Sequence, residues 1–168
     1  IENMLKDVEV ELGVDFFANR QELEASAEKV VFTGMIDQYF DYKHGELEYR
    51  SLRFEHEVLD EENYQGNAVV NYTEREIPYT RIIEHKHFEY GTQDKTVITR
   101  EYPADWKRGD EPYYPINDER NNAMFAKYQE EAAQNDKVIF CGRLADYKYY
   151  DMHVVIERAL NVVEEEFK

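Results

Sequence analysis

Cysteine is nearly absent from this sequence, which contains only Cys141 among 168 residues. A single cysteine cannot form an internal disulfide, which fits the reducing environment of the cytoplasm. Long apolar runs are also lacking, since none reaches the ~18 residues that a membrane-spanning helix requires, and no signal-peptide pattern opens the chain. We therefore expect a cytoplasmic protein that does not span a membrane.

Positive charge is scarce, because 20 Lys and Arg stand against 37 Asp and Glu and give a net charge of −17. A polyanion of this size repels nucleic acid and anionic membrane surfaces, so we expect neither as a partner. The balance still allows one phosphorylated small molecule to be held by a few well-placed arginines. The 14 Tyr and 9 Phe suit such a ligand, although most aromatic residues fill strands and cores. We identify no metal site in the sequence.

The central part of the chain alternates apolar and polar residues with the period of β-strands. Turn-forming residues such as Gly45 and the run from Asn63 to Asn67 separate these stretches. Consecutive strands with short turns predict an antiparallel meander. The expected strands are residues 47–58, 68–72, 79–88, 96–102 and 112–116.

Strands and helices are also expected on both sides of this central part. Residues 8–14 alternate apolar and acidic side chains and predict a half-buried strand. The apolar runs 29–34 and 138–142 both end in glycine and predict buried strands. One helix is expected from a cap at Asn117 or Asp118 to about residue 134. A last helix is expected after a cap at Asp151, with these residues facing inward: Val154, Val155, Ala159, Val162 and Val163.

This order of elements predicts an α+β fold. We expect an antiparallel sheet of about five or six strands, flanked by helices and inserted into the remains of an α/β layer. Residues 1–45 would belong to that layer, residues 46–116 would form the sheet, and residues 117–168 would return to the layer as helix, strand and helix.

Two motifs indicate a binding site. The buried strand that ends at Gly142 and Arg143 leads to a helix that opens at Asp151, an arrangement that brings backbone amides to a cofactor but is also common elsewhere. Arg81 lies in a strand between apolar residues, where a guanidinium holds a phosphate or a carboxylate. An ion pair with one of the 37 acidic residues is the alternative for Arg81.

Two tyrosine clusters add hydroxyl groups to these motifs. Strand alternation puts Tyr113 and Tyr114 on opposite faces, so only one of them can face a shared pocket. Tyrosines also cluster in residues 146–152, at the start of the last helix, where hydroxyls and helix amides together suit a diphosphate.

The motifs, taken together and in this order, resemble a known family. Residues 71–88 read Asn-Tyr-Thr-Glu-Arg-Glu-Ile-Pro-Tyr-Thr-Arg-Ile-Ile-Glu-His-Lys-His-Phe, which resembles the signature stretch of bacterial UDP-galactopyranose mutases. The resemblance covers essentially the whole chain from Val31 onward. It departs at residues 145–148, which read Ala-Asp-Tyr-Lys where the family commonly has Gly-Thr-Tyr-Arg. Further matching segments are Leu47–Leu52, Tyr64–Gly66, Tyr113–Pro115, Gly142–Leu144 and Tyr149–Met152.

The resemblance implies an isomerase that interconverts UDP-galactopyranose and UDP-galactofuranose, the sugar nucleotide of bacterial cell-surface polysaccharides. In such enzymes N5 of reduced FAD attacks the anomeric carbon of galactose and UDP leaves. The flavin–sugar adduct opens its ring and recloses through a different hydroxyl, and UDP then returns to the anomeric carbon and releases the flavin. The resemblance therefore implies UDP-galactose as the substrate, FAD as the cofactor and no catalytic group beyond the flavin.

The resemblance also implies roles for individual residues. Arg81 is expected to bind the diphosphate, with Tyr114 and Tyr149 donating hydrogen bonds to it. Asp151 is expected near the sugar and the diphosphate, and Asn71 on the nucleotide side. The expected cofactor contacts are Gly34, Gly142, Arg143 and Met152, the last through its backbone amide.

Several parts of the family have no match in this sequence. They are the Gly-rich fingerprint that cradles the FAD pyrophosphate, the helical domain that stacks uracil, and the arginine of a mobile loop. We therefore expect the C-terminal part of a longer enzyme, inactive and without FAD by itself. Its strands buried on both faces would leave an exposed apolar flank, so we expect a homo-oligomer rather than a clean monomer.

Two other interpretations remain open from the sequence. A non-catalytic sugar-nucleotide-binding or protein-interaction module would use the same sheet. A generic flavin oxidoreductase would share the terminal strand and helix but would have no use for the tyrosine and arginine set. An upstream strand–Gly-x-Gly-x-x-Gly–helix in the natural gene would favour the mutase.

Overall fold

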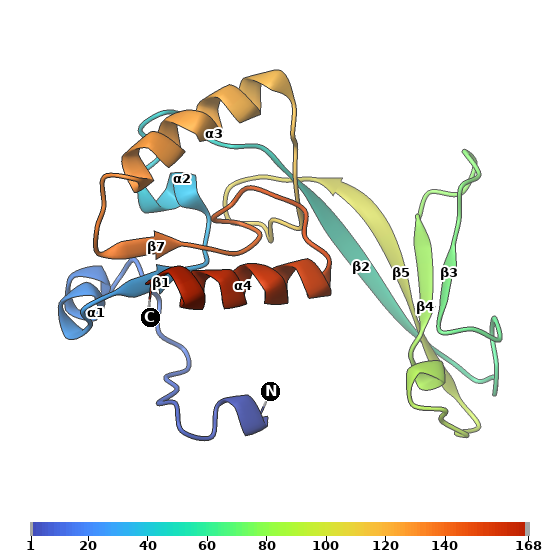
Figure 1. The fold of residues 1–168 in the computed structure, drawn as a ribbon. Helices are drawn as coiled ribbons and strands as arrows, with labels where there is room; N and C mark the ends of the chain where they lie inside the picture. The colour runs from blue at the N-terminus through green and yellow to red at the C-terminus, as the bar shows by residue number, and fades with distance from the viewer. Residues whose placement is uncertain (1, 167–168) are drawn as a thin grey trace. The chain divides into compact units, whose positions relative to one another are not determined.

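The computed structural model describes residues 2–166. These residues form two compact units, unit 1 with residues 2–46 and 122–166 and unit 2 with residues 47–121. Figure 1 shows helices around short strands in unit 1 and a curled antiparallel sheet in unit 2, which confirms the predicted α+β class. Among these residues, no helix is both long enough and apolar enough to cross a membrane.

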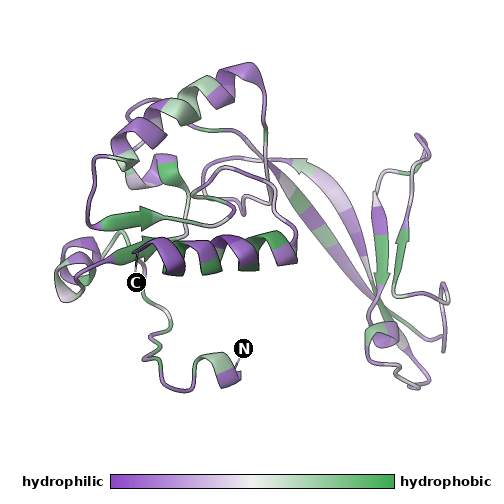
Figure 2. Ribbon diagram, in the orientation of Figure 1, coloured by the Kyte–Doolittle hydropathy of each residue, from purple (hydrophilic) through white to green (hydrophobic). Residues whose placement is uncertain are grey.

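Unit 2 is built on one five-stranded antiparallel sheet, which agrees with the predicted number of strands. The strands follow the order β3-β4-β5-β2-β6 across the sheet. Figure 2 shows alternating polar and apolar bands along the two long strands, the pattern on which their prediction depends. The strands are β2 (Tyr49–Leu59), β3 (Val69–Asn71), β4 (Arg81–Glu84), β5 (Thr96–Asp105) and β6 (Tyr114–Pro115).

The prediction of a simple meander is wrong for β2. Strands β3, β4 and β5 are sequential neighbours, but β2 pairs with β5 along nearly its whole length and lies between β5 and β6. Only β5 is long enough to satisfy the backbone of β2, because β3 has 3 residues and β4 has 4. The expected strand at 79–88 is also shorter than predicted, since β4 ends at Glu84 and His85–Phe88 form the 3₁₀ helix η2.

Unit 1 contains two short parallel strands at the predicted apolar runs, β1 (Val30–Phe32) and β7 (Val138–Phe140). Phe32, Tyr39 and Val138 form its buried core, and four further phenylalanines pack against them: Phe16, Phe17, Phe40 and Phe140. The helical elements are η1 (Glu2–Met4), α1 (Arg20–Ser26), α2 (Ile36–Tyr39), α3 (Glu119–Ala132), which begins in unit 2, and α4 (Met152–Glu166).

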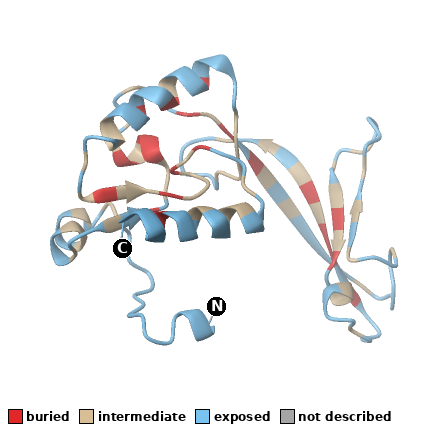
Figure 3. Cartoon of the chain, in the orientation of Figure 1, coloured by how far each residue is buried: buried red, intermediate tan, exposed pale blue. Residues whose placement is uncertain are grey.

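Both long helices begin where the sequence predicts. Asp118 Oδ1 accepts a hydrogen bond from the backbone N–H of Asn121 at 2.7 Å and caps α3. Helix α4 begins directly after Asp151. The predicted inward face of α4 is only partly correct, because the narrow two-stranded β1–β7 pair covers little of this 15-residue helix (Figure 3). Val162 is buried, Val154 and Val155 are half-buried, and Ala159 and Val163 are exposed.

The predicted strand at residues 8–14 is wrong. The segment is irregular, and its four apolar side chains are all exposed, with Leu12 at 88%. Alternation produces a strand only where a partner strand supplies the hydrogen bonds and a core covers the apolar face. Within residues 2–166 no strand pairs with this segment.

Candidate functional site

One face of the sheet in unit 2 carries the arginine that is predicted to bind a diphosphate. The strand register places Asn71, Arg81, Glu101 and Phe54 directly opposite one another on β3, β4, β5 and β2. Residues that lie opposite one another in antiparallel strands share one face of the sheet. These four residues therefore form a row across the sheet, called here the Arg81 row.

Arg81 contacts both of its neighbours in this row. Its Nε donates a hydrogen bond to Asn71 Oδ1 at 2.9 Å, and its Nη1 lies 3.5 Å from Glu101 Oε2. The Arg81 side chain is 38% exposed while that of Glu101 is 9% exposed. The ion pair considered as the alternative for Arg81 thus exists, but it is long and involves few of the five guanidinium donors. The other N–H donors of the partly exposed Arg81 guanidinium can therefore bind an anion.

A cavity of about 580 Å³ lies next to the Arg81 row within unit 2. Glu101, Thr80 and Tyr114 all line it, so the partner of Arg81 and the predicted diphosphate ligand Tyr114 face the same space. Tyr113 instead packs edge-on against Phe54, with ring centroids 5.9 Å apart. Of the two tyrosines, only Tyr114 lines the cavity, but Tyr113 contacts Phe54 of the Arg81 row and lies before β6 begins, so their predicted placement on opposite faces of the sheet is not confirmed. The apolar part of the lining consists of Leu52, Pro103, Ala104 and Ile116.

In unit 1 the predicted strand–glycine–helix unit is present. β7 ends at Phe140, and Gly142 follows with a φ of +99°, a conformation that favours glycine. A Cβ on Gly142 would be in ordinary van der Waals contact with Thr33, at 3.7 Å, so the positive φ rather than a clash favours glycine here. At Gly34 a Cβ would lie 2.6 Å from the ring of Phe32, so the absence of a side chain there lets this ring pack against the backbone.

Asp146 anchors the loop between β7 and α4. Its Oδ2 accepts hydrogen bonds from the backbone N–H of Gly142 at 3.3 Å, from the Tyr150 hydroxyl at 3.2 Å and from Arg158 Nε at 3.2 Å. Asp146 is one of the three residues within 145–148 at which the sequence departs from the family pattern. Asp146 therefore fixes the loop through these hydrogen bonds, and the strand–glycine–helix geometry is present despite the difference in sequence.

The other predicted residues of unit 1 lie around the start of α4. The Arg143 guanidinium carbon is 5.4 Å from the centroid of the Tyr149 ring, a cation–π distance. Tyr149 is 59% exposed, Met152 is 86% exposed, and Asp151 is also exposed. The structure brings Arg143 to Tyr149 in unit 1 and Asn71 to Arg81 in unit 2. Convergence of the two sets on one ligand stays a prediction.

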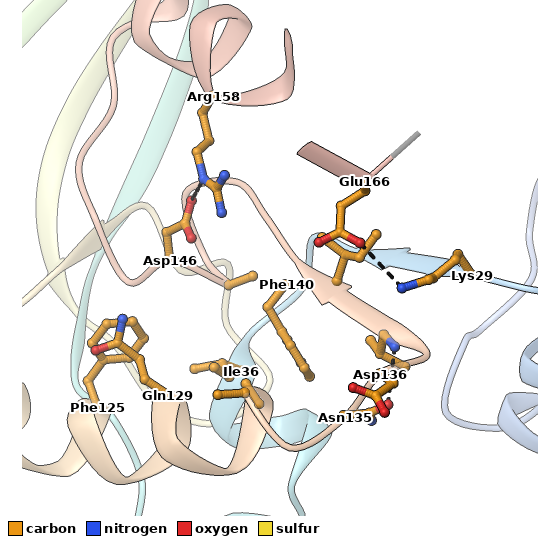
Figure 4. A pocket seen from close by; sticks show the side chains of 15 residues that line it. Lys29, Ile36, Phe125, Gln129, Asn135, Asp136, Phe140, Asp146, Arg158 and Glu166 are labelled. Atoms are coloured by element: carbon orange, nitrogen blue, oxygen red, sulfur yellow. Dashed lines mark hydrogen bonds and ion pairs between the residues drawn. The ribbon is translucent and has the colours of Figure 1, made fainter. Parts of the chain in front are cut away.

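A second cavity, of about 440 Å³, lies in unit 1 and is lined by residues of α3, α4 and β7 (Figure 4). Four of its charged side chains form two ion pairs, Arg158 with Asp146 at 3.2 Å and Lys29 with Glu166 at 3.3 Å, and Asp136 also lines the cavity. Phe125, Ile36 and Phe140 supply apolar walls. None of the predicted site residues lines this cavity, so the candidate site rests on the Arg81 row and the start of α4.

The sequence analysis missed Glu101 and Thr80. Thr80 Oγ1 lies 3.3 Å from Glu101 Oε1, where its hydroxyl can donate to the carboxylate that pairs with Arg81. Alternation alone shows that Glu101 shares a face with its neighbours two residues away, but only the strand register places it opposite Arg81. In the described part of the chain, no group of three or more His, Cys, Asp or Glu side chains could hold a metal ion.

Glu84, at the end of β4, is a fully buried carboxylate that the sequence analysis also missed. Burial by itself would raise its pKa, but the hydrogen bonds that it accepts lower the pKa to about 2. The donors are the backbone N–H groups of Tyr64 at 3.0 Å and Gln65 at 2.9 Å and the Thr96 hydroxyl at 2.8 Å. His87 Nε2 lies 3.1 Å from the same carboxylate. Glu84 therefore fastens the Tyr64–Gly66 loop to the sheet.

Comparison with known proteins shows the family. The sequence profile of the UDP-galactopyranose mutase family matches residues 1–149, so the chain belongs to this family. It is 35% identical over 169 residues to a dTDP-fucopyranose mutase of Escherichia coli, with 97% of the chain covered. It is 36% identical over 161 residues to a probable UDP-galactopyranose mutase of Klebsiella pneumoniae, with 95% covered, and 38% identical over 142 residues to a UDP-galactopyranose mutase of Mycoplasma pneumoniae, with 81% covered. The chain spans 45%, 41% and 35% of these three relatives, less than half of their length.

Proposed function

We propose that the protein is a UDP-galactopyranose mutase, an isomerase that interconverts UDP-galactopyranose and UDP-galactofuranose. The observation that carries the proposal is the setting of Arg81, whose buried partner Glu101 lines one cavity together with Tyr114. Membership of the mutase family supports catalysis over a non-catalytic binding module or a generic flavin oxidoreductase. The E. coli relative, a dTDP-fucopyranose mutase, makes a dTDP-linked deoxysugar the second candidate substrate.

In this proposal the residues of the chain stabilise the departing UDP. Breaking the bond between the anomeric carbon and the diphosphate places negative charge on the diphosphate oxygens, and donors that meet this charge lower the barrier. Arg81 would contribute positive charge and N–H donors, and Tyr114 and Tyr149 their hydroxyls. Asp151 would lie near the sugar and the diphosphate, and Asn71 would belong to the same set through its bond to Arg81.

The residues on the cofactor side fit an FAD. Gly142 has a positive φ that favours glycine, and α4 begins at Met152, whose N–H belongs to the first turn and has no carbonyl partner within the helix. We propose that Gly34, Gly142, Arg143 and Met152 contact the flavin, with Arg143 and the helix N-terminus favouring negative charge on its ring. The chemistry that reduced FAD supplies when bound is a nucleophilic nitrogen for the anomeric carbon.

The proposed enzyme is cytoplasmic. Cys141, the single cysteine, is buried, and burial raises the pKa of its thiol, so it stays protonated near neutral pH. A protected thiol of this kind fits a reducing compartment.

The test is turnover by the protein expressed from its natural reading frame, with FAD reduced by dithionite. UDP-galactofuranose and dTDP-fucopyranose are supplied in parallel, and the products are separated by liquid chromatography. Arg81→Ala should lower kcat/KM about 100- to 1,000-fold, because it removes charge-assisted contacts that strengthen as UDP departs. The matched control is Arg53→Ala, which removes an exposed arginine of β2 that is adjacent to Phe54 and therefore on the opposite face of the sheet.

The outcomes separate the parts of the proposal. Arg53→Ala should remain within about twofold of the wild type. Wild-type turnover by Arg81→Ala would refute the role of Arg81. A protein that holds reduced FAD but converts neither sugar nucleotide would refute the proposed function, and conversion of only the dTDP-linked sugar would select the second candidate.

A further inference from the structure

Asn71 stands at the edge-strand end of the Arg81 row. It is the last residue of β3, an edge strand of the sheet, and it lies directly opposite Arg81. Its Oδ1 is the acceptor for Arg81 Nε at 2.9 Å, which is good geometry for a hydrogen bond. The acceptor group of Asn71 is therefore directed at the arginine.

The two contacts of Arg81 restrict its guanidinium on both sides. An arginine on an exposed face of a sheet samples many rotamers, and its planar fork binds a diphosphate well only when the plane is already oriented. Asn71 holds the Nε side, and Glu101 lies 3.5 Å from Nη1 on the other side. Of these two contacts the bond to Asn71 is the shorter, and it involves a neutral partner that adds no negative charge near a bound anion.

We propose that Asn71 is a positioning residue for Arg81, which orients the guanidinium for the diphosphate without itself contacting the substrate. The inference rests on the proposed function, because the diphosphate is the ligand that Arg81 would bind. It requires an acceptor at residue 71, so Asn71→Asp should keep Arg81 in place, whereas Asn71→Leu, of similar volume but without an acceptor, should release it.

The first measurement is independent of any ligand. Proton–nitrogen NMR of the arginine Nε–H groups, on the protein expressed from its natural reading frame, reports the order and the exchange rate of Arg81 Nε–H. We expect an ordered, slowly exchanging group in the wild type and in Asn71→Asp, and a disordered, rapidly exchanging group in Asn71→Leu. An unchanged Arg81 signal in Asn71→Leu would overturn the inference.

The second measurement is the affinity for UDP by titration calorimetry, arranged as a double-mutant cycle. Asn71→Leu should weaken UDP binding about 3- to 10-fold, the loss expected when one orienting hydrogen bond is removed. Arg81→Met should weaken it more than about 10-fold, because charge-assisted donors to the diphosphate are lost. In the Arg81→Met background, Asn71→Leu should change the affinity by less than about twofold, because it acts only through Arg81.

Asn67→Leu is the matched control, since Asn67 precedes the same strand and its side chain forms no hydrogen bond among residues 2–166. It should leave both the Arg81 signal and the UDP affinity unchanged. An effect of Asn71→Leu that persists in full in the Arg81→Met background would show a direct contact with UDP and overturn the inference. Wild-type affinity in Arg81→Met alone would instead refute the assignment of Arg81 in the proposed function, while the NMR result would still decide whether Asn71 orders this arginine.

Discussion

Replacing Glu84 by glutamine removes a charge from the interior of unit 2 with almost no change in side-chain size. The carboxylate accepts three hydrogen bonds, from the Tyr64 and Gln65 backbone and from Thr96. A glutamine offers one oxygen and one NH₂ group, so at least one buried N–H loses its acceptor, at a cost of about 1–3 kcal/mol. The pKa of Glu84 falls from 4.5 to about 2 on folding. That shift is equivalent to about 3 kcal/mol of stabilisation of the charged form.

We therefore expect Glu84→Gln to lower the free energy of unfolding of unit 2 by about 3 kcal/mol at neutral pH. A carboxylate with a lowered pKa stabilises the fold fully above its unfolded pKa and loses this contribution as the pH falls through its folded pKa. The wild type should therefore lose this stabilisation from about pH 4.5 down to about pH 2, whereas the variant has no such titration. The difference between the two proteins should shrink over the same range.

Urea unfolding is the assay, followed by the fluorescence of Trp106. This is the single tryptophan of the chain, it lies in unit 2, and its indole N–H donates to the Asp110 carbonyl at 2.9 Å. Glu61→Gln, which neutralises an exposed carboxylate in the segment after β2, is the control and should change the stability by less than about 0.5 kcal/mol. A Glu84→Gln variant as stable as this control, or a difference that does not depend on pH, would refute the reasoning.

Three further predictions concern unit 1. The 168-residue chain should self-associate, because four apolar residues of α4 are between 55% and 86% exposed: Met152, Ile156, Leu160 and Val163. Leu160→Glu should reduce the association, and a monodisperse wild-type monomer in light scattering would contradict this prediction. The same chain should not retain FAD after gel filtration, because it carries no Gly-rich pyrophosphate cradle, and stoichiometric flavin absorbance would show that the segments around Gly34 and Gly142 suffice. Gly142→Ala should lower the free energy of unfolding by about 1–2 kcal/mol, because alanine is strained at a positive φ. Its Cβ, 3.7 Å from Thr33, would meet no clash, so strain is the only cost expected. An unchanged melting temperature would count against this strain.

Local patterns were sufficient to predict the individual strands of the sheet. Alternation identified β2 and β5 to within a few residues, and the short apolar runs identified β1 and β7. Pairing could not be predicted in the same way, because it depends on which backbone groups remain to be satisfied after all strands are placed. The short β3 cannot serve the long β2, so β2 pairs with β5, which is far away in the sequence.

Residues 8–14 and α4 show the limit of patterns at the surface. In both, the spacing of apolar residues identifies a face that would pack well, but it does not say what covers that face. Leu12 and Leu160 are accordingly exposed, at 88% and 62%. The spacing of apolar residues in one sequence therefore does not identify the segment that packs against an apolar face.

The candidate site was predictable where one residue is unusual by itself. Arg81 stands out because a charged guanidinium lies among apolar strand residues. Glu101 does not stand out among 37 acidic residues, and its importance arises only from its position opposite Arg81. Glu84 is equally ordinary in sequence, since its low pKa depends on amides from a loop that folds back onto the strand.

The parallel pairing of β1 with β7 imposes an order on folding during synthesis. Val30 pairs with Val138, so about one hundred residues, including all of unit 2, are translated between the two strands, which takes roughly 5–20 s at ribosomal rates. The strands of unit 2 are contiguous in sequence and can fold as they emerge. The aromatic cluster around Phe32 and Tyr39 cannot complete its packing until Phe140 has been synthesised. During that interval its rings are available to chaperones and to neighbouring nascent chains, so unit 1 is the part of the molecule most exposed to misassembly on the ribosome.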